Sequence, residues 1–167
     1  MLRGRFARPL AVLVLSAVSA ALMPAHAGTA EVHRPMRKAR YASAMETFEQ
    51  QLIVEINKAR ERARVPVIRV ADACLDGIAE DWSRHLVDLG DLLHRDQSVV
   101  LRRCHQSWAG ENLIRGSRLT PAQAVQAWLA SPAHKAVLLK HRASRIGIAV
   151  RRDGRGRYVG VLNLGDS

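Results

Sequence analysis

The stretch AWLASPAHKAVLL (residues 127–139) predicts the end of one helix and the start of another. Ser131 suits the N-cap of the second helix, and Pro132 suits its first turn. His134 then takes the third helical position, where the partial positive charge of the helix N-terminus disfavours an imidazolium. A neutral His134 could serve as a metal ligand or as a hydrogen-bond acceptor. The alternative is a histidine that bonds only to nearby backbone.

A carboxylate lies upstream in GENLI (residues 110–114), which predicts a short strand. Glu111 shares a face with Leu113 because side chains alternate along a strand. A carboxylate on an otherwise buried strand needs a partner, since burial without one is costly. That partner belongs either to a functional site or to a structural pair with a backbone N–H or an arginine.

A second histidine, His94, lies in DLLHRD (residues 91–96). Loops often carry solvated histidines, and spacing alone does not bring His94, Glu111 and His134 together. The motifs HExxH and GxSxG are absent from the sequence. The residues alone therefore predict no metal or nucleophile motif.

The remaining elements predict an α+β fold. The segment 45–64 has an apolar stripe at helical spacing, formed by Phe48, Leu52, Ile56 and Ala59. A second helix is expected between Asp72, its cap, and Gly90, its stop signal. Its buried face is expected to consist of Leu75, Ile78, Ala79, Trp82, Leu86 and Leu89.

Two further patterns complete this layout. Thr120, Pro121 and Gln123 form a helix start of the capping-box type. The segment 145–164 alternates on both sides of Asp153-Gly154 and predicts a hairpin, whereas residues 91–108 are expected to be irregular. Helices in the first half and strands at the end are typical of α+β proteins.

The first residues predict a segment for export. A basic start, an apolar run of about 14 residues and small residues at Ala25 and Ala27 are typical of a signal peptide, here residues 1–27. The alternative is a retained N-terminal anchor, although the run is shorter than the roughly 20 residues of a membrane span. Residues 28–45 are expected to form a flexible basic leader, and the mature protein is expected to be secreted and extracytoplasmic.

The chain is strongly basic. Its formal net charge of +11 falls to +8 without the three arginines of residues 1–27, which contain no acidic residue. A basic surface can meet nucleic acid, anionic lipid or acidic cell-wall polymers, and export argues against nucleic acid. Two explanations of the positive charge stay open: a partner with an anionic surface, or a compositional bias toward arginine.

Two cysteines, Cys74 and Cys104, are present. A single pair in an exported protein favours one disulfide, which would close a loop of about 30 residues and stabilise the fold by roughly 3–4 kcal/mol. Two free thiols are the less favoured alternative. A metal site formed by this pair is the least favoured alternative, because neither cysteine belongs to a CxxC or CxxH motif.

Taken in order, LLH, GENL, AWLASPAHKAVLL, IGIAV and YVGVLNLG resemble the CAP superfamily of cysteine-rich secretory proteins, antigen 5 and pathogenesis-related proteins, in its short bacterial form. The resemblance covers residues 46–167 and begins at the helix containing INKAR. It implies one domain over residues 46–167. The implied fold is an α-β-α sandwich with a central antiparallel sheet.

The resemblance also implies a surface cleft where His94, Glu111 and His134 converge. The second acid of the larger members has no clear match, because the position three after Trp128 holds Ser131, so the set is incomplete. Ser131 and Asn112 are further cleft candidates. The alternative for Asn112 is that it orders the turn. His94 and His134 are the tentative metal ligands, with Zn²⁺ or another divalent cation as the possible cofactor.

Three functions follow as expectations, of which we favour the first. The first is a non-catalytic extracellular binding module for a divalent metal, a small apolar ligand of lipid or sterol type, or a cell-envelope component. The second is a zinc-dependent hydrolase or protease with Glu111 as general base and candidate catalytic residue. The third is a structural surface protein with a vestigial cleft.

Overall fold

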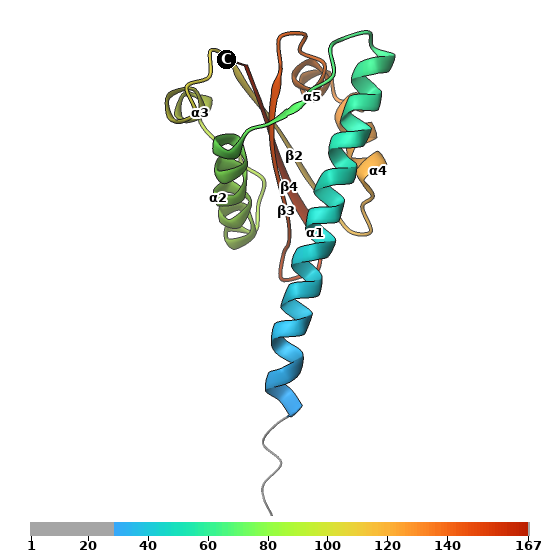
Figure 1. Ribbon diagram of the computed structural model, residues 1–167, viewed down its shortest axis with the longest axis vertical. Helices are drawn as coiled ribbons and strands as arrows, with labels where there is room; N and C mark the ends of the chain where they lie inside the picture. The colour runs from blue at the N-terminus through green and yellow to red at the C-terminus, as the bar shows by residue number, and fades with distance from the viewer. Residues whose placement is uncertain (1–28, 167) are drawn as a thin grey trace, which may run out of the picture.

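The computed structural model describes residues 29–166 and consists of one four-stranded sheet between two helical layers (Figure 1). The elements follow the chain in this order: α1 (Thr29–Arg62), β1 (Val70–Ala71), α2 (Ala73–Leu89), α3 (Gln97–Arg103), β2 (Ala109–Gly116), α4 (Pro121–Ala130), α5 (Pro132–Leu138), β3 (Arg145–Arg152) and β4 (Tyr158–Gly165). The predicted signal peptide, residues 1–27, lies outside the described residues. Among the helices of residues 29–166, none combines the length and apolar character needed to cross a membrane.

The sheet has the strand order β1-β3-β4-β2. Strands β2, β3 and β4 pair antiparallel, as predicted, and Asp153-Gly154 lies in the turn of the β3–β4 hairpin. The two-residue strand β1 pairs parallel with β3, so the sheet is mixed rather than purely antiparallel. The chain runs from an extended turn into β1 and then into α2. The parallel direction of β1 relative to β3 was not predicted from the sequence pattern.

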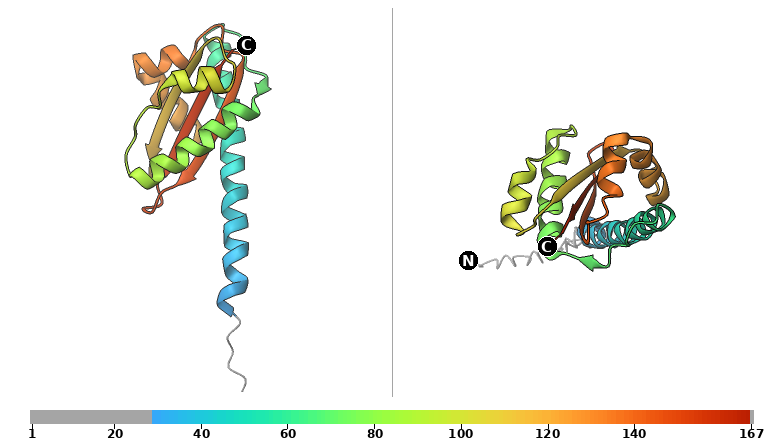
Figure 2. Two further views of the ribbon diagram at one scale, coloured as in Figure 1. Left: turned by 90° about the vertical axis from the view of Figure 1, so that its left-hand side faces the viewer. Right: turned by 90° about the horizontal axis from the view of Figure 1, so that it is seen from above.

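Alternation along the strands assigns each side chain to one of two faces. Helices α1, α4 and α5 cover one face, and α2 covers the other together with α3 (Figure 2). The first face buries Ile148 and Leu162 against Leu52, Ile56 and Trp128. On the second face, an apolar group joins the sheet to α2 and consists of Ala79, Leu86, Leu113, Ala149, Val159 and Val161. The predicted α-β-α sandwich is therefore confirmed.

The predicted helix caps are largely confirmed. The Asp72 side chain accepts the N–H groups of Cys74 and Leu75, and Gly90 ends α2 in a left-handed conformation. Thr120 and Gln123 form the complete capping box of α4. Ser131 takes the N-cap position of α5, but its side chain makes no capping hydrogen bond, so its backbone alone starts the helix.

Helix α1 begins at Thr29, within the segment 28–45 for which a flexible leader was expected. Two predictions about the elements were wrong. The segment 91–108 contains α3, which Asp96 caps at Ser98 N–H. Leu89 is 49% exposed rather than buried, because α2 ends there at Gly90.

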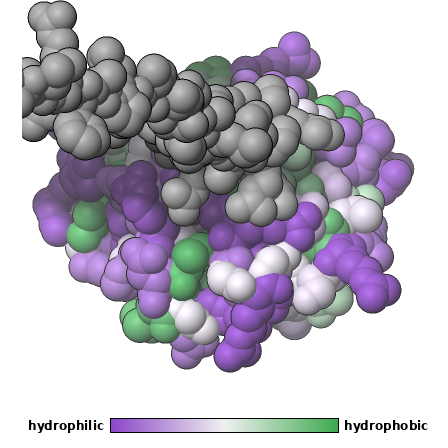
Figure 3. Space-filling view, turned by 90° about the horizontal axis from the view of Figure 1, so that it is seen from below, coloured by the Kyte–Doolittle hydropathy of each residue, from purple (hydrophilic) through white to green (hydrophobic). Residues whose placement is uncertain are grey.

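The open edge of β3 is protected by carboxylates. Beyond its short contact with β1, the N–H groups of Ile148 and Val150 donate to Asp76 and Glu49, at 2.9 and 2.6 Å. Burial raises the pKa of both carboxyl groups, and the backbone hydrogen bonds oppose that rise. Side-chain acceptors at a sheet edge discourage pairing with another chain. Seen from below the orientation of Figure 1, the coloured surface is mainly hydrophilic with scattered apolar residues (Figure 3).

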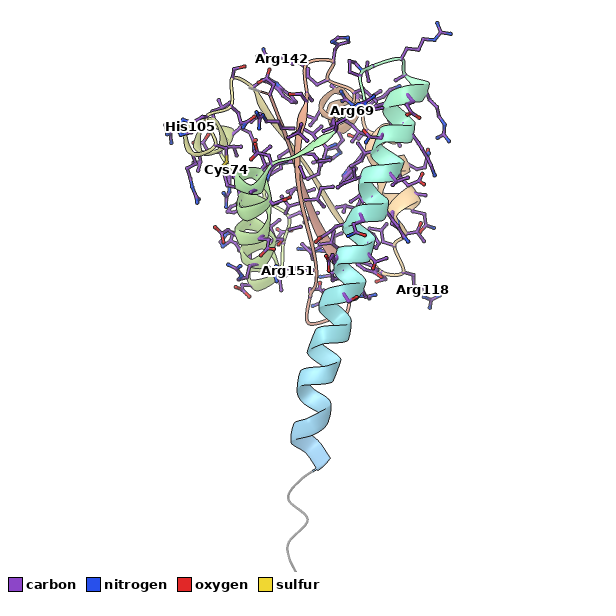
Figure 4. All side chains as sticks on the ribbon, in the orientation of Figure 1. Arg69, Cys74, His105, Arg118, Arg142 and Arg151 are labelled. Carbon is purple, nitrogen blue, oxygen red and sulfur yellow. A yellow bond between two sulfur atoms is a disulfide. The ribbon has the colours of Figure 1, made fainter. Side chains whose placement is uncertain are left out.

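Two tertiary links fix the upper part of the fold. A disulfide joins Cys74 at the start of α2 to Cys104 at the end of α3, as predicted (Figure 4). The buried Arg60 guanidinium donates to four carbonyl oxygens, which belong to Pro66, Leu138, Lys140 and Ala143. Arg60 therefore ties the end of α1 to the turn that connects α5 with β3.

Candidate functional site

The candidate site lies at the free edge of β2. This strand is last in the sheet order and, within residues 29–166, pairs only with β4. Because nothing in the sheet continues beyond it, segments from both helical layers can meet there. The loop after α2 approaches from one face and α5 approaches from the other.

Glu111 and His94 form a direct contact at this edge. His94 Nδ1 lies 2.8 Å from Glu111 Oε1, and the Arg95 N–H donates to the same oxygen at 3.2 Å. The Glu111 side chain is 1% exposed, whereas that of His94 is 57% exposed. A carboxylate accepts hydrogen bonds, so His94 donates from Nδ1, and its Nε2 forms no hydrogen bond to the described residues.

His134 reaches the same edge from α5. Its backbone carbonyl accepts the Asn112 Nδ2–H at 3.0 Å, and Asn112 is fully buried on the face opposite Glu111. The ring centroids of His94 and His134 are 6.1 Å apart. Successive residues of β2 therefore hold the two histidines, with Glu111 contacting one ring and Asn112 fixing the backbone that carries the other.

The electrostatics of the site favour a neutral His134. Burial lowers the pKa of His134, and the neighbouring His94 lowers it further. Burial raises the pKa of Glu111, while the hydrogen bonds from His94 and the Arg95 N–H oppose that rise. A neutral imidazole is the form that binds metals and accepts hydrogen bonds.

The loop that carries His94 is held by α2. The Trp82 indole N–H donates to the Leu93 carbonyl at 2.9 Å, and the Arg95 guanidinium lies 4.7 Å from the centre of the Trp82 ring. Trp82 was predicted to be a core residue, yet it is only partly buried. Its polar end fixes the loop in place, a contact that the helical stripe could not indicate.

The structure does not bring every predicted residue into this group. Ser131 lies at the junction of α4 and α5, and within residues 29–166 its side chain forms no hydrogen bond to the histidines or to Glu111. No three His, Cys, Asp or Glu side chains of the described residues are arranged to hold a metal ion. A large groove of about 740 Å³ lies elsewhere, between α1 and α2 along β3.

This geometry limits the chemistry of the site. The His94 and His134 rings have their centroids 6.1 Å apart, and the His94 side chain is 57% exposed. Two histidines can hold a cation only if water or a ligand completes its coordination. Glu111 is turned inward, which suits a carboxylate that orients a histidine better than one that contacts a substrate.

Comparison with known proteins supports the fold. A model of the cysteine-rich secretory protein family, CAP, matches residues 54–164. No curated protein sequence is significantly similar to the chain. An outer surface protein from Borrelia burgdorferi is structurally similar, with a TM-score of 0.64, 21% identity, and coverage of 73% of this chain and 94% of that one.

Two other solved structures have the same fold. An extracellular protein with an SCP domain from Bacillus anthracis has a TM-score of 0.61 and 22% identity, over 71% of this chain and 40% of that one. A cysteine-rich secretory protein from Staphylococcus aureus has a TM-score of 0.56 and 18% identity, over 70% and 37%. The chain spans less than half the length of these two. From the family match and this shared fold, the chain belongs to the CAP family of cysteine-rich secretory proteins.

Proposed function

We propose that the protein is an extracellular binding module that holds a divalent cation, with Zn²⁺ the best fit, between His94 and His134. One observation carries the proposal: a buried carboxylate accepts from His94 Nδ1, so Nε2 is the nitrogen left without a hydrogen bond to residues 29–166, and the centroid of the His134 ring is 6.1 Å from that of His94. Zinc-binding histidines commonly donate their other ring nitrogen to such a carboxylate, which fixes the tautomer. Coordination would leave positions open for water or for a ligand.

The proposal predicts weak but saturable zinc binding. Chelator-treated residues 28–167, titrated with Zn²⁺ by calorimetry, are expected to bind one equivalent. His94→Ala with His134→Ala removes both nitrogen donors, so we expect affinity to fall at least about 100-fold, below detection. Glu111→Gln keeps both donors but loses the charged acceptor, and a decrease of about 10–100-fold is expected.

The control for this titration is His141→Ala. His141 is an exposed histidine outside the group at β2, so this variant should bind zinc as the wild type does. Equal zinc binding by the wild type and the His94/His134 double variant would refute the proposed site.

The hydrolase hypothesis has less support. It requires Glu111 to act as general base on a metal-bound water, but the Glu111 side chain is 1% exposed and Oε1 is engaged by His94 and Arg95. A general base must come within hydrogen-bond reach of the proton that it removes. The inward position of Glu111 favours binding without turnover.

A small apolar ligand is a second candidate, favoured by the surface next to His94. Leu92 and Leu93 are 36% and 56% exposed, and both directly precede His94. Contiguous exposed apolar surface rimmed by polar residues marks some ligand-binding sites. Leu92→Ser with Leu93→Ser should weaken binding of a fluorescent fatty-acid analogue about 10-fold or more, as expected from burial of two leucine side chains. Val54→Ser, at an equally exposed position on α1, is the matched control, and equal binding by all variants would exclude this surface.

Export and an anionic partner remain part of the proposal. The related structures from Borrelia and Bacillus are described as an outer surface protein and an extracellular protein, respectively. The basic first residues, the apolar run after them and the disulfide are consistent with the same location for this chain. The net positive charge would favour contact with an anionic cell-envelope component.

A further inference from the structure

The second oxygen of Glu111 has no hydrogen-bond donor within the described part of the chain. Oε1 receives hydrogen bonds from two groups, whereas Oε2 is buried without a partner. A buried charged oxygen without a donor is costly, because a missing hydrogen bond to a charged group destabilises the structure more than a missing hydrogen bond to a neutral group. A hydrogen-bond donor on this side of Glu111 would satisfy Oε2.

Asn163 is the residue placed to supply that donor. It lies on β4 directly opposite Glu111, and its side chain is fully buried. Two residues further along each strand, the pair Leu113 and Val161 packs against α2, so alternation puts Glu111 and Asn163 on that same face. Neither amide atom of Asn163 has a partner among residues 29–166.

The Glu111 and Asn163 side chains are cross-strand neighbours on one face of the sheet. Directly opposite residues of antiparallel strands have Cβ atoms about 4.5–5.5 Å apart. On the other side of Asn163, the paired residue is Gly147, which has no side chain. A Cβ at Gly147 would collide with the backbone of Leu75, so α2 closes this side.

We infer that Asn163 is a positioning residue for Glu111, with its amide N–H linked to Glu111 Oε2 through one ordered water molecule. The water accepts from Asn163 Nδ2 and donates to Oε2, which satisfies one orphaned atom on each strand. Buried waters commonly bridge such groups, provided that polar partners surround them. The link keeps the carboxylate turned toward His94.

Side-chain amide exchange in the metal-free protein tests the link. In the wild type, the Asn163 NH₂ protons should exchange slowly with solvent by NMR. In Glu111→Leu, which removes the acceptor from a buried site, they should exchange at least about tenfold faster, the factor that corresponds to 1.4 kcal/mol. Asn112 is the internal control, because its amide donates to His134 O on the opposite face and should change little. Unchanged exchange at Asn163 would overturn the inference.

A second variant tests the positioning role without altering Glu111. Asn163→Leu keeps the side-chain volume and removes the donor, so His94 should lose its single Nδ1–H tautomer, observed by ¹⁵N chemical shifts at pH 8. A folded variant with the wild-type melting temperature and an unchanged tautomer would contradict a positioning role.

The expected tenfold loss of zinc affinity in this variant rests on the proposed function. If the wild type binds no zinc, that proposal fails alone, and the exchange and tautomer measurements still decide the role of Asn163.

Discussion

Replacing Arg60 with leucine is expected to lower the free energy of unfolding by about 3–5 kcal/mol, because buried carbonyl oxygens lose their charged donor. The Leu138 and Ala143 carbonyls are bonded by Arg60 in the buried interior, at 2.8 and 3.1 Å. An unsatisfied buried acceptor costs about 1–3 kcal/mol, and two such costs add to the loss of packing around the Arg60 stem.

Urea denaturation of the oxidised protein at pH 7 measures this effect. Arg62→Leu is the matched control, since Arg62 is exposed two residues further along α1 and should change stability by no more than about 0.5 kcal/mol. Arg60→Lys should be intermediate, because an ammonium keeps the charge but lacks the planar fork that reaches several carbonyls. A loss below about 1 kcal/mol in Arg60→Leu would show that the Arg60 contacts do not hold the α5–β3 turn.

Removing the disulfide is expected to cost about 3–4 kcal/mol. Cys74 and Cys104 are 30 residues apart, and a bond across that separation restricts the unfolded chain by this amount in the chain-entropy model. The comparison is between the oxidised wild type and Cys74→Ala with Cys104→Ala, where alanine avoids burying a hydroxyl at Cys104. Reduced wild type is the control and should unfold at the same urea concentration as the variant. Equal stability of all three proteins would contradict a stabilising role for the bond.

Much of the fold could be predicted because the apolar residues that recur at helical spacing in the sequence are also the residues buried in the core. The stripe Phe48, Leu52 and Ile56 is buried as predicted, and so is Trp128. The capping box at Thr120 determines the start of α4 without reference to any other element. Helix α3 was missed because seven residues are too few to show a helical period in the sequence. Its N-cap, Asp96, could be recognised only from the folded structure.

The candidate site depends on contacts that sequence spacing does not contain. His94 and Glu111 are 17 positions apart, and their contact exists only because the loop after α2 folds back over the edge of β2. Resemblance to the CAP superfamily brought these residues together in the prediction, and the family match supports that resemblance. The role of the Trp82 indole and the place of Asn163 opposite Glu111 follow from strand register and helix packing, for which the sequence had no local signal.

The location of zinc in the loaded protein is the most direct test of the proposed metal site. Crystals grown from the zinc-saturated wild type should give one anomalous peak at the zinc edge, within about 2.0–2.1 Å of His94 Nε2 and of one His134 nitrogen. Glu111 should remain bonded to His94 Nδ1 and should not touch the metal. Zinc bound at other side chains, with no peak between these two rings, would contradict the account.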